Sequence, residues 1–205
     1  MILKFRPRAL GPGLLLLATA CGHGGKAQVP TPATRAPTGS AAVACLSSGD
    51  GYLRATVAGA VESKIDWPNS GTHCQGESRD QPPGVRISFQ RDGAEPDLLL
   101  IFGLTGIKAG VPARAVGVNL TVIVQGTEHI YGTLGDSRCT VDRLSQRELG
   151  IPGVYRVEAR GFCTQPAHAV RGTGDVLVST FDFAGPVSFL SDDPKPDPQL
   201  AHEGH

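Results

Sequence analysis

Histidine is the residue type in this chain best suited to binding a metal ion. Residues 202–205 read His-Glu-Gly-His, and imidazole and carboxylate groups suit zinc or copper. These residues end a polar tail in which nothing would hold them in place, so we expect no metal site there. His73, His129 and His168 show neither His-x-His nor His-Glu-x-x-His spacing. We therefore predict no metal and no other cofactor.

Acidic side chains that could act in general acid–base chemistry are scattered, and most flank expected turns. Asp182 is the exception, because it lies between Phe181 and Phe183 in an expected strand. Its side chain either faces solvent or lines a pocket, and we favour solvent. The sequence also contains no Gly-x-Ser-x-Gly, P-loop or Ser-x-x-Lys motif. We therefore predict that the protein is not an enzyme and assign no catalytic residue.

Three arginines could together bind an anionic group. Arg138, Arg156 and Arg160 fall on the two strands expected around residues 138–163. Cross-strand pairing with acids such as Asp136 or Glu158 is the simpler explanation, and we favour it.

The N-terminus has the pattern of a secretory signal peptide. Three basic residues (Lys4, Arg6 and Arg8) precede four leucines at 14–17, and small residues then lead to Cys21. The apolar run is too short to span a bilayer. This order predicts an exported protein.

The end of this segment resembles the lipobox of bacterial lipoproteins, although Ala18 stands where that box usually has leucine. The resemblance covers about the first 22 residues. It implies that Cys21 carries acyl chains such as palmitate, that residues 1–20 are removed, and that the protein is anchored on the extracytoplasmic side of a membrane. The cell envelope is then its location. The alternative is a freely secreted protein.

Charge and composition exclude several classes of function. Residues 1–20 contain three basic residues and no acid, so their removal lowers the formal net charge from 0 to −3. Such a chain lacks the basic surface that nucleic acid requires. Met1 is the only methionine, which rules out thioether copper sites in the mature chain.

The four remaining cysteines predict two disulfides in an exported chain. We favour Cys45–Cys74 and Cys139–Cys163 among three possible pairings. A hairpin turning near residues 150–153 would place Cys139 and Cys163 opposite each other. Thiolate metal binding is disfavoured because no Cys-x-x-Cys spacing occurs.

The polar segments divide the chain into four parts. We expect a signal peptide at 1–20, a lipidated cysteine and disordered tether at 21–43, one globular domain at 44–190, and a disordered tail at 191–205.

The domain has the two-residue period of β-strands. Apolar and polar residues alternate over 116–125, and the run 97–104 is apolar on both faces. In the last strand we expect Leu177, Phe181 and Phe183 on one face and Val176 and Val178 on the other. A helical turn is expected only at residues 145–149. The pattern predicts an antiparallel β-sandwich of about eight to nine strands, with a closed β-barrel as the alternative.

Two functions from different classes fit these features. The first is a non-enzymatic interaction or structural module that binds an envelope protein. The second is a carrier of a small apolar ligand or lipid, for which residues apolar on both strand faces would line a cavity. A dense core needs the same residues, so the carrier is the alternative.

Overall fold

A computed structural model describes residues 43–189 of the chain. The expected signal peptide, Cys21, nearly all of the expected tether and the C-terminal tail lie outside these residues. The described part is all-β and contains no helix that could cross a membrane. Its eleven strands are β1 (Tyr52–Gly59), β2 (Ser63–Pro68), β3 (Thr72–Asp80), β4 (Pro83–Arg91), β5 (Leu98–Thr105), β6 (Val116–Val124), β7 (Ile130–Gly132), β8 (Cys139–Glu148), β9 (Val154–Cys163), β10 (Ala167–Arg171) and β11 (Asp175–Ser188).

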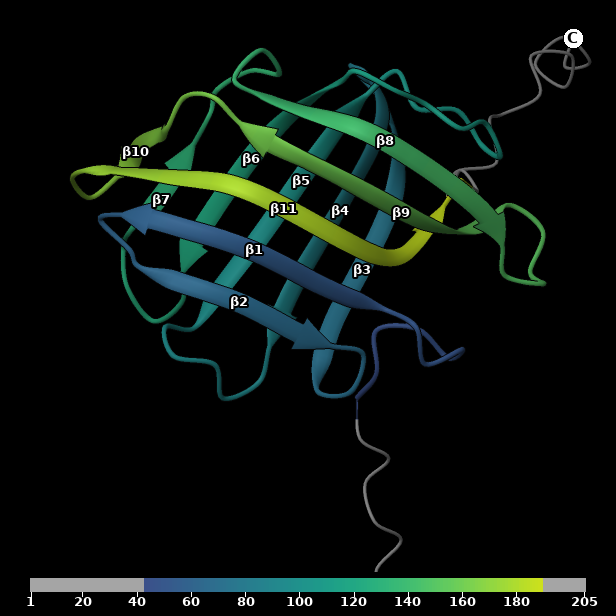
Figure 1. Ribbon diagram of the computed structural model, residues 1–205, viewed down its shortest axis with the longest axis horizontal. Coiled ribbons are helices and arrows are strands. Elements are labelled where there is room, and N and C mark those ends of the chain that lie inside the picture. The colour runs from purple at the N-terminus through teal and green to yellow at the C-terminus, as the bar shows by residue number, and fades with distance from the viewer. Residues whose placement is uncertain (1–42, 190–205) are drawn as a thin grey trace, which may run out of the picture. The chain divides into compact units, whose positions relative to one another are not determined.

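The strands pack as two layers, which gives the expected antiparallel, sandwich-like fold. The near layer in Figure 1 has the order β2-β1-β11-β9-β8, and its strands cross those of the rear layer, β3-β4-β5-β6-β7. Strand pairing also connects the layers, between β6 and β8 and along β7-β10-β11. A single parallel bridge, Ser188 with Glu77, joins β11 to β3.

Four phenylalanines fill the space between the layers. Phe89 and Phe102 come from the rear layer, and Phe181 and Phe183 come from β11. Each is at most 2% exposed, and the ring of Phe102 lies 5.0 Å from that of Phe181 and 4.9 Å from that of Phe183. Fully burying one such side chain contributes about 1.5–3 kcal/mol, so this cluster is a major source of stability.

The alternation in β11 differs from the sequence expectation. Val176, Val178, Phe181 and Phe183 are all buried, although strict alternation would place the valines and phenylalanines on opposite faces. The cause is a β-bulge, because Thr56 pairs with Thr180 and the next residue of β1 pairs with Val178. One extra residue in β11 reverses the face on which the following side chains lie.

The strand boundaries also correct the sequence expectations. Residues 145–148, expected to form a helical turn, continue strand β8 and pair with β9. The turn itself lies at Gly150–Gly153, as expected, because Leu149 N donates to Val154 O at 2.9 Å. The count exceeds eight to nine because β2, β3 and β10 were not predicted.

The structure joins the four cysteines in the pairs favoured from the sequence. Cys139 and Cys163 lie opposite each other on β8 and β9. Cys45 precedes β1 and is joined to Cys74 of β3. The second disulfide therefore connects the segment that enters the near layer to a strand of the rear layer.

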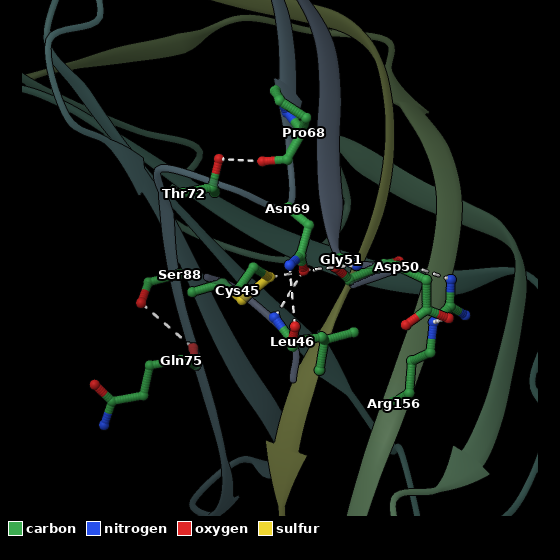
Figure 2. Close-up of a disulfide and its surroundings, with 12 residues drawn as sticks. Cys45, Leu46, Asp50, Gly51, Pro68, Asn69, Thr72, Gln75, Ser88 and Arg156 are labelled. Atoms are coloured by element: carbon green, nitrogen blue, oxygen red, sulfur yellow. Dashed lines mark hydrogen bonds and ion pairs between the residues drawn. A yellow bond between two sulfur atoms is a disulfide. The ribbon is translucent and has the colours of Figure 1, made fainter. Parts of the chain in front are cut away.

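Asn69 holds the entrance to β1 (Figure 2). Its Oδ1 accepts hydrogen bonds from Leu46 N at 2.8 Å and Gly51 N at 2.9 Å, and its Nδ2 donates to Leu46 O at 3.0 Å. Asp50, in the same turn, is ion-paired with Arg156 of β9 at 2.8 Å. These contacts fix the point from which β1 starts across the near layer.

Replacing Cys139 and Cys163 together by serine should lower the free energy of unfolding by about 3 kcal/mol, because the bridge restricts the unfolded chain. Urea denaturation of the full chain measures the difference. An unchanged unfolding midpoint would contradict a stabilising disulfide. As a control, thiol titration of the unfolded, unreduced wild type should detect no free cysteine in the domain.

Candidate functional site

A groove of about 400 Å³ lies on the near layer, and we call it the outer-face groove. Its volume is at the lower end of the range of ligand pockets. Strands β1, β2, β8, β9 and β11 all contribute to it. The side chains that line it and are not buried are Arg54, Thr56, Lys64, Asp66, Asp142, Arg160, Phe162, Thr180 and Asp182.

Four side chains of alternating charge, which all line the groove, form a row across the strands of the near layer. Strand register places Asp66 opposite Arg54, Arg54 opposite Asp182, and Asp182 opposite Arg160. Arg54 Nε lies 3.2 Å from Asp66 Oδ1, and Arg160 Nη2 lies 3.1 Å from Asp182 Oδ2. Exposed pairs of this kind contribute about 0.2–1 kcal/mol each. Their main effect here is to hold the side chains in a fixed order.

Asp182 is the centre of this row. It lies on the outward face of β11, the side that was favoured, but it lines the groove and its side chain is only 21% exposed. Besides Arg160 it contacts Tyr52, whose hydroxyl donates to Asp182 Oδ1 at 2.8 Å. The guanidinium carbon of Arg54 lies 4.8 Å from the centre of the Tyr52 ring. The carboxylate is therefore held by partners on two neighbouring strands.

Burial, followed by the hydrogen bond to Asp182, raises the pKa of Tyr52 from 10.0 to about 12. The fold thus favours the neutral phenol. The stability that this contributes is complete below pH 10.0, the ordinary value, and is lost as pH rises toward 12.

Phe162 supplies the apolar wall of the groove. It follows Arg156, Glu158 and Arg160 at two-residue spacing, so it belongs to the polar, outward face of β9. It is 37% exposed, whereas the phenylalanines between the layers are buried. The neighbouring Gly161 has no room for a side chain, because a Cβ there would lie 2.1 Å from Thr140 O and 2.6 Å from the Phe181 ring.

A second β-bulge adds an acid to the groove. Val141 pairs with Gly161 and Arg143 pairs with Arg160, which leaves Asp142 as the extra residue of β8. Both Asp142 and Arg143 are consequently exposed on β8. Bulges commonly redirect a side chain beside a binding site. Here the bulge brings a carboxylate of β8 into the lining of the groove.

The three arginines considered as an anion site are not gathered. Arg156 is paired with Glu158 at 2.7 Å, but within β9 rather than across strands, and also with Asp50, and its side chain is 13% exposed. The Ser48 hydroxyl, which donates to Asp50, and the nearby Arg156 guanidinium lower the pKa of the Asp50 carboxyl. Arg160 is paired with Asp182, and Arg138 instead donates to Pro166 O at 2.9 Å.

The three domain histidines have different partners and do not share a site, although β7, which follows His129, pairs with β10, which carries His168. His73 contacts Asp92 at 2.9 Å, and His168 contacts Asp175 at 2.7 Å. His129 stacks on the ring of Tyr131. Within residues 43–189, no three histidine, cysteine or acidic side chains come together in a way that could hold a metal ion. Residues 202–205 lie outside the described chain.

Several groove residues escaped the sequence analysis, Lys64 and Phe162 among them, and so did Tyr52, which contacts Asp182. Lys64 belongs to β2, which was not predicted, and Tyr52 lies at the first position of β1. Phe162 carried a usable signal, because the alternation of Arg156, Glu158 and Arg160 places the next position on the outward face.

The fold and site define an all-β, disulfide-linked domain with a charged groove on one outer face. No protein-family model, no curated protein and no solved structure matches this chain.

Asp182→Asn should lower the pKa of Tyr52 from about 12 toward 10.0, because the carboxylate disfavours the phenolate. The decrease should be partial, since burial of Tyr52 remains. Ultraviolet titration of the phenolate, with Tyr52→Phe to assign the signal, measures the shift. An unchanged titration in Asp182→Asn would contradict the contact.

Proposed function

We propose that the protein is a membrane-anchored, exported lipoprotein and that its β-sandwich domain is a non-enzymatic binding module of the cell envelope. The outer-face groove is the binding surface, and a protein of the envelope is the partner. The observation that carries the proposal is Phe162, a partly exposed aromatic ring on a face whose other groove side chains are polar or charged.

The composition of the groove supports binding rather than reaction chemistry. Two of its three carboxylates, Asp66 and Asp182, are ion-paired with arginines in the groove. An aromatic residue surrounded by a polar, charged rim is the arrangement in which interface hot spots are found.

The interior supports the same choice. The space between the layers is occupied by the side chains of Phe89, Phe102, Phe181 and Phe183, whose rings contact one another. A ligand therefore has more room in the outer-face groove than between the layers.

Two further features support the location. Disulfides persist in oxidising compartments outside the cytoplasm. The lipobox-like end at Cys21 supplies the anchor, and two or more acyl chains are needed for stable attachment.

Cys21→Ser should move the protein from the membrane fraction to the soluble fraction, because the acyl chains would be absent. Fractionation of cells that express the full chain, followed by immunoblotting, gives the result. Wild type serves as the reference. Membrane retention of the variant would mean that the attachment lies elsewhere.

Phe162→Ser should weaken partner binding about tenfold or more, because truncating an aromatic hot-spot residue costs about 2 kcal/mol or more and 1.4 kcal/mol corresponds to tenfold. A photo-cross-linking amino acid at Thr56, an exposed residue that lines the groove, reports partner contact in intact cells. The matched control is Val170→Ser, which changes an exposed apolar residue of β10. Equal adduct yields from Phe162→Ser and wild type would contradict the proposal.

The alternative is a carrier of a small apolar ligand or lipid. The groove volume, about 400 Å³, is the observation in its favour. Native mass spectrometry of protein isolated from its own envelope distinguishes the two functions. Extra mass that disappears on denaturation, and that Phe162→Ser abolishes, would establish the carrier. Bare mass would favour the protein partner.

A further inference from the structure

Strand β2 has a free edge. Among the described strands it is the only one with a single neighbour, since it pairs with β1 alone. Half of its backbone N–H and C=O groups therefore lack a strand partner. An edge of this kind is a template for pairing with another strand, and natural proteins protect it where pairing is unwanted. In Figure 1, β2 forms the margin of the near layer.

The charges on this edge are self-complementary. Lys64 and Asp66 are exposed on the outward face of β2, with the buried Ile65 between them. Consider two copies of β2 that pair antiparallel about a two-fold axis at Ile65. Lys64 then lies opposite the partner's Asp66, and Asp66 lies opposite the partner's Lys64. Because the two strands are identical and related by the two-fold axis, this register forms the same Lys64–Asp66 ion pair twice.

We propose that two copies of the chain associate through this β2–β2 pairing. The near layer becomes a continuous sheet across the two copies. The row Arg160, Asp182, Arg54 and Asp66 is extended by the partner's Lys64, so opposite charges continue to alternate across the junction. Both paired residues of β2 line the groove, and the partner thereby contributes a cation at its open side.

The pairing should be weak in solution and stronger on a membrane. Six residues of one edge bury less surface than the roughly 1,200–2,000 Å² of a stable interface. An anchored protein is confined to a surface, which raises the effective concentration of its copies. The groove's use of the partner's Lys64 rests on the proposed function, whereas the pairing itself does not.

Charge reversal tests the register. In Lys64→Asp, acids face acids across the two-fold axis, and in Asp66→Lys, cations face cations. Each single variant should weaken dimerisation about tenfold or more, because two attractive pairs become repulsive. The double variant Lys64→Asp/Asp66→Lys restores opposite charges and should recover most of the affinity.

Sedimentation equilibrium of the full chain in detergent micelles, over a range of protein-to-detergent ratios, measures dimerisation. The matched control is Lys108→Asp, an exposed lysine away from β2 that should leave dimerisation unchanged. Circular dichroism melting shows that each variant folds, which matters because the new lysine at 66 lies beside Arg54. A monomeric wild type, single variants that still dimerise, or a folded double variant that fails to recover would each overturn the proposal.

A further variant separates this inference from the proposed function. Phe162→Ser should leave dimerisation unchanged while it weakens cross-linking to the envelope partner. Loss of the dimer together with retained partner contact in Lys64→Asp would show that the groove acts without the second copy. Such a result would overturn the shared groove alone.

Discussion

The packing of four phenylalanine rings between two layers of crossing strands is the constraint that the groove depends on. Phe181 and Phe183 are on β11, which is also the strand that carries Asp182 on its opposite face. Because the two rings are buried between the layers, the Asp182 side chain between them points to the outer face of the near layer. Gly161 takes part as well, because the Phe181 ring occupies the space that a side chain there would need. The apolar interior and the polar outer face are two consequences of one strand's alternation.

Electrostatics then organises the outer face. Each pair in the row from Asp66 to Arg160 is weak by itself, since the Arg54 and Asp66 side chains are 61% and 78% exposed. Tyr52 strengthens the centre of the row by donating to Asp182 from a partly buried position. A surface whose side chains are already held in place loses less conformational entropy when it binds. In the groove, the contacts among Tyr52, Asp182 and Arg160 restrict the side chains before any partner binds.

Strand edges are a further feature that a sheet protein has to control. Among the described strands, β2 alone pairs with a single neighbour, β1. That edge lies beside the groove rather than on the opposite layer. Lys64 and Asp66 of this short strand line the groove, and in the proposed dimer they would also form the ion pairs between the two copies.

Strands with a strong two-residue period were predictable from the chain alone. Val116–Val124 is one example, and the hairpin that joins Cys139 to Cys163 is another, because local alternation and turn residues specify both. Strand β3 was not predictable, since its buried positions are small or polar. It forms because β4 pairs along its length and because Val187 of β11 packs against Gly76.

The faces of the last strand were also beyond local reasoning. A bulge near Ser179 depends on how β11 pairs with β1, and it reverses the side on which Val176 and Val178 lie. The same holds for Asp142, which a second bulge exposes. Alternation along one strand establishes that a strand exists and that Asp182 and Phe181 point in opposite directions. Which residues meet across strands, and so the groove itself, depends on register, and register is set by contacts between segments far apart in the chain.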